Sequence, residues 1–164
     1  MKDYGCFNFL INGLGGQSSG SARQDLERAL KLGIPKYLFW FLGMNDTDPN
    51  TYITNVELIR TLCQRNGIEL ILATVPTVPT RSKEVISQYV RDSGLRYVDF
   101  YKAVRTNSSG RWHAGYLHTS ESEAVHHTAL GAQALASQIL IDFPEIMQYG
   151  TINTDQVGSV IGDN

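Results

Sequence analysis

Short apolar runs alternate along this chain with segments in which apolar residues recur at the spacing of an α-helix. The runs are rich in β-branched, leucine and aromatic residues and show little polar alternation, which is typical of strands buried on both faces of a sheet. Four runs have this character: Cys6–Ile11, Tyr37–Leu42, Glu69–Val75 and Arg96–Tyr101. Their alternation with helical segments predicts an α/β fold with a parallel sheet.

The helical segments separate and follow these strands. Small polar residues precede two of them: Ser19, Gly20 or Ser21 can cap the first, and Ser82 is expected to cap the third. The predicted helices are Ala22–Leu32, Tyr52–Arg65, Lys83–Ser93 and Ala129–Phe143. The residues expected on the inward faces of the last two are Val85, Ile86, Tyr89 and Val90, and Leu130, Leu135, Ile139 and Leu140.

Composition and charge exclude several classes of partner. The 164 residues carry 14 basic and 16 acidic side chains without a basic cluster, so no nucleic acid partner is expected. No stretch approaches the roughly 18 apolar residues of a membrane span, and residues 1–5 lack the apolar core of a signal peptide. No membrane partner is therefore expected, and the compartment stays unknown. Cys6 and Cys63 lie in apolar surroundings and are expected to be buried free thiols.

The length fits one domain, which we place at residues 1–147, followed by a C-terminal tail at residues 148–164. A polar connection over residues 106–125 has no helical or strand periodicity. A loop of about 20 residues is uncommon in so small a domain unless it has a function. Its Trp112, Tyr116 and His118 are candidates to line a substrate pocket, and ordinary loop packing is the alternative.

Glycine-rich and polar segments lie where ligands bind in open parallel sheets, beyond the carboxyl ends of the strands. Residues 12–21 follow the first strand, residues 43–48 follow the second, and residues 123–131 lead into the last helix. Each segment alone also fits an ordinary turn or helix cap. The first matches neither the dinucleotide fingerprint nor the P-loop. A zinc site is not indicated, because the spacing of the four histidines fits no common ligand pattern; they are His113, His118, His126 and His127.

Taken in order, the three segments resemble consecutive blocks of the SGNH (GDSL-like) hydrolase family. Asn12–Gly16 resembles the second block, Gly43–Asp46 the third, and Glu123–Gly131 the fifth, so that the resemblance covers about residues 6–147. It implies a flavodoxin-like three-layer αβα sandwich with a parallel sheet. It also implies a serine-type ester hydrolase, such as an acetylesterase, which needs no cofactor or metal.

The resemblance assigns roles to individual residues. Gly16 would supply a backbone N–H and Asn45 a side-chain N–H to an oxyanion hole, where negative charge develops on the tetrahedral intermediate. His126 would be the general base, since an imidazole can accept and return a proton near neutral pH. Glu123 would orient this imidazole. Asp46 and Trp112 are further candidates, for substrate binding.

Two residues depart from the family pattern in the fifth block. Glu123 stands where the family has aspartate, so the bond that orients the imidazole needs a shifted backbone or another acceptor. His127 stands where the family has proline. Both departures also fit a non-catalytic descendant.

The family's first block, a Gly-Asp-Ser strand with the nucleophile, has no counterpart before Cys6. Ser18, Ser19 and Ser21 are interpreted as loop or capping residues. In the family the first strand lies between the second and third, so its absence would leave buried, unpaired strand edges. Three arrangements could fill the gap. The first is a strand from another polypeptide. The second is the tail with Asn164 at the nucleophile's position, either from the same chain or exchanged with a neighbouring molecule, and the third is a shift of Cys6–Ile11 into the central place.

Three functions are therefore considered. The first is hydrolysis of a small ester or an acylated carbohydrate through an acyl-enzyme. The second is a non-catalytic binding or attachment module with the same fold. The third is a flavodoxin-like binder of phosphorylated ligands at the glycine-rich turn over residues 13–20.

Overall fold

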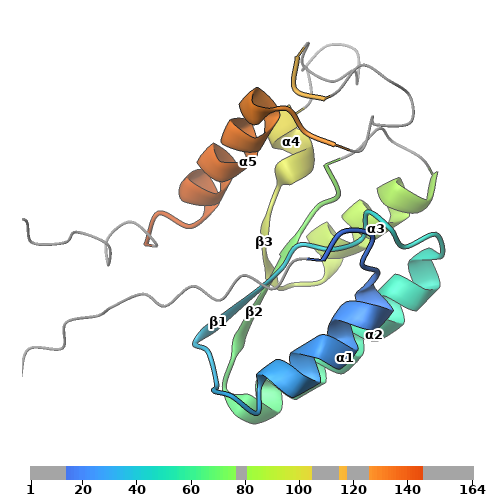
Figure 1. Ribbon diagram of the computed structural model, residues 1–164, viewed down its shortest axis with the longest axis vertical. Helices are drawn as coiled ribbons and strands as arrows, with labels where there is room; N and C mark the ends of the chain where they lie inside the picture. The colour runs from blue at the N-terminus through green and yellow to red at the C-terminus, as the bar shows by residue number, and fades with distance from the viewer. Residues whose placement is uncertain (1–13, 77–80, 105–114, 118–125, 146–164) are drawn as a thin grey trace, which may run out of the picture.

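The computed structural model describes residues 14–76, 81–104, 115–117 and 126–145 (Figure 1). The elements in these ranges are α1 (Ser19–Ala29), β1 (Tyr37–Trp40), α2 (Pro49–Asn66), β2 (Glu69–Ala73), α3 (Arg81–Asp92), β3 (Arg96–Val98), α4 (Phe100–Val104) and α5 (Ala129–Asp142). The strands form a parallel sheet in the order β1-β2-β3, with Tyr37 of β1 opposite Glu69 of β2 and Ile71 of β2 opposite Arg96 of β3. The parallel α/β prediction is confirmed. The predicted strand Cys6–Ile11 and the boundary at residue 147 lie outside the described residues.

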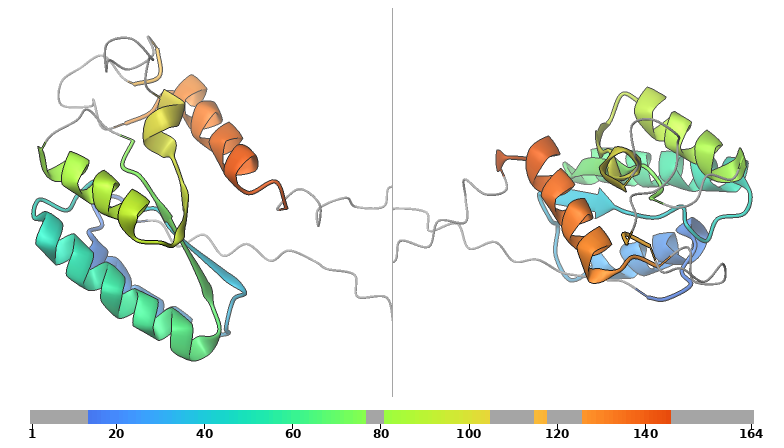
Figure 2. Two further views of the ribbon diagram at one scale, coloured as in Figure 1. Left: turned by 180° about the vertical axis from the view of Figure 1, so that it is seen from behind. Right: turned by 90° about the horizontal axis from the view of Figure 1, so that it is seen from above.

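The sheet is buried on both faces, because alternate residues of β2 enter different hydrophobic clusters. Leu70 and Leu72 pack with α1, α2 and α3, whereas Ile71 and Ala73 pack with α4 and α5. The views from behind and above place α5 on the side of the sheet away from α1 and α2 (Figure 2). This two-sided burial explains why the strands show no polar alternation.

The fourth predicted strand, Arg96–Tyr101, is shorter than expected. It ends at Val98, and the residues predicted to continue it, Phe100 and Tyr101, belong to α4. Asp99 causes the change, because its carboxylate accepts a hydrogen bond from the backbone N–H of Lys102 at 3.2 Å and so caps the new helix. Thr74, which directly follows β2, holds the junction, because its hydroxyl donates a hydrogen bond to the Asp99 carboxylate at 2.9 Å.

Helix starts also differ from the predictions. Ser18 is the N-cap of α1, which begins at Ser19 and ends at Ala29. The second helix begins at Pro49 instead of Tyr52, because the Asp48 carboxylate caps it and proline suits a first helical position. The third begins at Arg81, so Ser82 is not its cap.

Three residues predicted to face inward are exposed instead. Val85 is 43% exposed, and Leu130 and Leu140 of α5 are 50% and 41% exposed. In α3 the buried stripe runs through Ile86 and Val90. In α5 it runs through Leu135 and Ile139. The helical periodicity is confirmed, but the buried face of each helix is narrower than predicted.

The prediction of a buried free thiol is confirmed for Cys63. Burial raises the pKa of this thiol to about 11. Cys6 lies outside the described residues. No helix within the described ranges is long and apolar enough to cross a bilayer.

Candidate active site

The loop that follows β1 requires glycine at its first bend. Gly43 has φ of 115°, a conformation that other residues rarely adopt, and a Cβ at this position would lie 2.9 Å from Val75 Cγ2. The chain can therefore pass close to β2 and α3 here. This passage brings Met44, Asn45 and Asp46 out beyond the carboxyl end of β1.

The first two motifs predicted from the sequence touch each other through Asn45. Its side-chain Nδ2 donates a hydrogen bond to the backbone carbonyl of Gln17 at 3.2 Å. Gly16, the residue before Gln17, is exposed and has φ of 77°. It lies in a turn that is closed by a hydrogen bond from the Gln17 N–H to the Leu14 carbonyl. An amide has two N–H groups, so one can hold Asn45 against this turn while the other serves a ligand.

Asp46 ties the same loop to the start of α1. Its carboxylate accepts the Ser19 backbone N–H at 3.2 and 3.1 Å and the Ser19 hydroxyl at 2.5 Å. Asn55 of α2 donates to the Ser19 hydroxyl at 3.0 Å. Because Asp46 is 4% exposed and faces these protein groups, its carboxylate is directed away from solvent, although the sequence suggested it for substrate binding. The three serines interpreted as loop or capping residues lie at the N-cap and in the first turn of α1, and the hydroxyl of Ser19 is buried.

The third motif is held in place by the cap of α5. Thr128 Oγ1 accepts the N–H of Gly131 at 3.2 Å and donates to the Gly115 carbonyl at 2.5 Å. The Thr128 N–H also donates to the Tyr116 carbonyl at 3.1 Å. These bonds fix the two histidines that precede Thr128. His126 is exposed and His127 is half-buried.

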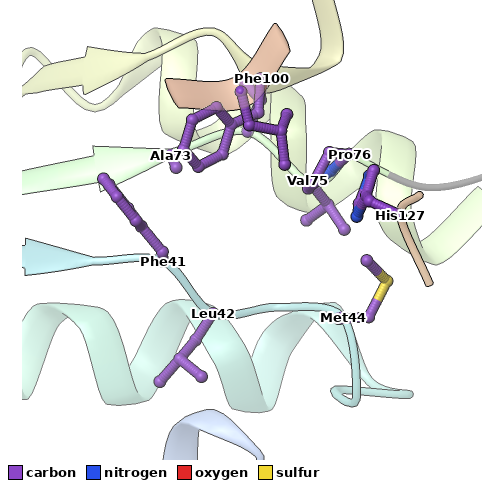
Figure 3. Close-up of a pocket in the computed structure, with 10 residues that line it drawn as sticks. Phe41, Leu42, Met44, Ala73, Val75, Pro76, Phe100 and His127 are labelled. Carbon is purple, nitrogen blue, oxygen red and sulfur yellow. The ribbon is translucent and has the colours of Figure 1, made fainter. Parts of the chain in front are cut away.

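An apolar cavity of about 240 Å³ lies between the carboxyl ends of β1 and β2 and the start of α5 (Figure 3). His127, Met44 and Pro76 lie together at one end of it, so the second and third motifs meet at this cavity. The remaining lining residues are Phe41, Leu42, Ala73, Thr74, Val75, Phe100 and Leu135. Nearly all of these side chains are apolar, so the cavity suits an apolar group.

Burial is the main reason that the pKa of His127 is lowered from its usual value. The backbone of Pro76 forms a hydrogen bond that acts in the opposite direction, and neighbouring His126 lowers the pKa further. His127 therefore has a lower pKa in the folded protein than in the unfolded chain, so folding favours its neutral form. The stability contributed by this neutral form is complete above the unfolded pKa of about 6.5 and is lost as the pH falls through the lower folded pKa.

Replacement of His127 by glutamine is accordingly expected to flatten the acid side of the stability profile. The melting temperature of the parent should fall more steeply than that of His127→Gln between about pH 7.5 and pH 5. The matched control is His126→Gln, which keeps His127 and removes only the smallest of the three contributions to its pKa shift, so its profile should stay close to that of the parent. Thermal unfolding followed by circular dichroism at several pH values measures the difference. Equal slopes for all three proteins would contradict the assignment.

Five residues named in the sequence analysis lie outside the described residues: Glu123, Trp112 and Asn164, and His113 and His118 of the four histidines. Among the residues that are described, no group of three histidine, cysteine, aspartate or glutamate side chains could hold a metal ion.

Sequence reasoning missed Lys83 and the pairing of Ser19 with Asp46. A lysine in an amphipathic helix is normally interpreted as part of its solvated face, but Lys83 Nζ donates to the carbonyl oxygens of Gly43 and Asp46. No local pattern could have indicated this contact, because its partners lie 37 and 40 residues away.

Comparison with models of known protein families and with curated protein sequences gives no match. Solved structures do match. A GDSL-like lipase from Bacteroides thetaiotaomicron superimposes with a TM-score of 0.66 at 16% identity, over 82% of this chain and 75% of the lipase. A protein assigned to the G-D-S-L lipolytic family, from Desulfitobacterium hafniense, superimposes with a TM-score of 0.62 at 17% identity, over 77% and 76% of the two chains.

This chain has the fold of the GDSL-like lipases. A third similar structure, a protein assigned as an acylhydrolase from Bacteroides fragilis, gives a TM-score of 0.66 at 17% identity. It covers 82% of this chain and 74% of its own. The predicted GDSL-like α/β architecture is thus confirmed, with a described sheet that is small.

Proposed function

We propose that this GDSL-like fold carries a serine-type ester hydrolase site, at the place where its three sequence motifs meet. The observation that most supports this proposal is the hydrogen bond from the Asn45 side chain to the Gln17 carbonyl. This hydrogen bond holds the Asn45 amide beside Gly16. The histidine pair lies near this loop, because His127 and Met44 line the same end of the cavity and His126 directly precedes His127. Acyl transfer requires hydrogen-bond donors and a proton acceptor close to one reacting carbonyl.

The proposed reaction uses these groups in sequence. A serine hydroxyl attacks the ester carbonyl carbon and passes its proton to His126, while Gly16 N–H and the second N–H of Asn45 stabilise the oxyanion. His126 then protonates the leaving alcohol, and water hydrolyses the acyl-enzyme by the same steps. Glu123 would orient His126. The serine would come from a Gly-Asp-Ser segment, which this sequence does not contain.

The apolar cavity favours a small acyl group. An apolar cavity of about 150 Å³ accepts benzene, so the space of about 240 Å³ beside Met44 and His127 is large enough for a short acyl chain. The alcohol side of the ester would face solvent near the exposed Gly16 and Asn45. This side can accommodate a bulky polar alcohol such as a carbohydrate.

Loss of the Asn45 amide is expected to lower kcat for an aryl acetate by about 10²–10³-fold, with a smaller change in KM, because the amide acts mainly on the charged intermediate. The matched control is Asn66→Ala. Asn66 is also exposed and also donates to a backbone carbonyl, that of Leu62, but at the far end of α2. The two variants are compared by steady-state hydrolysis, in protein expressed from the entire reading frame that contains residues 1–164.

Labelling of that protein with a fluorophosphonate tests the nucleophile directly. A labelled serine, together with loss of turnover in His126→Ala, supports the proposal. Hydrolysis that is as fast in His126→Ala as in the parent, or a folded protein that takes no label, would instead favour a binding module. The burial of the Ser19 hydroxyl against Asp46 is the observation in favour of that second function, because it removes one of the few serines near the site as a nucleophile.

A further inference from the structure

Lys83 reaches from α3 to the loop that carries Asn45. Its Nζ donates to the Gly43 carbonyl at 2.9 Å and to the Asp46 carbonyl at 2.5 Å. An ammonium group has three donors and no acceptor, so one side chain can satisfy both carbonyls. The two carbonyls belong to the residues at the two ends of the Gly43–Asp46 loop, with Met44 and Asn45 between them.

The other contacts of this loop hold different atoms. The Asp46 carboxylate is bonded to Ser19 of α1, and the Asn45 side chain is bonded to the Gln17 carbonyl. Those contacts fix the side chains, whereas Lys83 fixes the backbone from which both side chains project. The Asp46 carboxylate moves with the backbone that carries it. The bonds from Lys83 oppose rotation of the Gly43 and Asp46 peptide planes, and so they also keep this carboxylate against Ser19.

We infer that Lys83 is a positioning residue, which holds the backbone on either side of Asn45 so that the second N–H of the amide points at the reacting carbonyl. The inference rests on the proposed function. Preorganised donors stabilise a developing charge without reorganising during the reaction, and a displacement of about 1 Å can reduce a rate by about 10²-fold. The half-buried Lys83 therefore acts through Asn45 and does not touch the substrate.

Two substitutions separate the bonds of Lys83 from its bulk. Lys83→Met keeps the aliphatic chain but removes every donor, whereas Lys83→Arg keeps a charged donor group. Lys102→Met is the control, since Lys102 is an exposed lysine on α4. All three are made in the full chain.

The first measurement does not depend on activity. Amide hydrogen exchange of the Ser19 N–H reports on the loop, because this buried proton is donated to the Asp46 carboxylate. Exchange is expected to be about tenfold faster or more in Lys83→Met, and close to the parent rate in Lys83→Arg and Lys102→Met. An unchanged Ser19 rate in Lys83→Met would overturn the inference, whether or not the protein hydrolyses esters.

The second measurement is the effect on turnover. In the active protein, Lys83→Met is expected to lower kcat by about 10–100-fold with KM nearly unchanged, and Lys83→Arg to restore most of it. Faster Ser19 exchange with an unchanged kcat would overturn the positioning role while leaving the proposed function intact. If the parent hydrolyses no ester, the proposed function fails, and with it the positioning role in catalysis; the exchange result then decides only whether Lys83 holds the loop.

Discussion

Replacement of Asp46 by alanine is expected to lower the free energy of unfolding by about 3 kcal/mol, because it leaves buried hydrogen-bond donors without their charged acceptor. The donors are the backbone N–H and the hydroxyl of Ser19, which lies at 0% exposure. In a protein of this size the loss corresponds to a melting temperature lower by about 6–12 °C. Urea unfolding followed by circular dichroism measures the change in midpoint at constant slope.

Asp48→Ala is the matched control for this experiment. Asp48 is also an aspartate whose carboxylate accepts backbone N–H groups at a helix start, those of Asn50 and Thr51, but it is exposed to water. Water can replace its carboxylate, so a much smaller loss is expected. Equal losses in the two variants would mean that burial of the Asp46 contacts adds nothing to their strength.

Replacement of Gly131 by alanine is expected to separate the start of α5 from the chain that packs against it. A Cβ at this position would lie 2.2 Å from the Tyr116 carbonyl oxygen, a backbone atom that cannot rotate away. Relief of the clash must displace the cap at Thr128, and the two histidines before it move with that cap. We expect a loss of about 3 kcal/mol in stability and, in an active protein, a turnover reduced by about 10²-fold.

Gly33→Ala provides the comparison, since nothing lies within 4 Å of a Cβ built there and its φ is not positive. This variant should unfold at nearly the parent midpoint. A Gly131→Ala protein that is as stable as Gly33→Ala would show that α5 and the segment over residues 115–117 are not packed as described.

The sequence determined which segments become strands and helices, and in which order the motifs follow. An apolar run without polar alternation is stable as a strand only between two layers, and Leu70 and Ile71 enter opposite clusters for that reason. Local chemistry also carried information that the predictions overlooked. Asp48 before Pro49 marks the start of α2, and Asp99 marks the start of α4.

Tertiary structure decided how those motifs are held. The contact of Ser19 with Asp46 spans 27 residues and that of Lys83 with Gly43 spans 40, distances over which a local pattern has no influence. Tertiary packing also turned the Asp46 carboxylate toward the interior. It placed His127, rather than the exposed His126, against the cavity. The type of a residue determines which groups its side chain can bind. Which partner it binds depends on the groups that packing brings within about 3 Å of it.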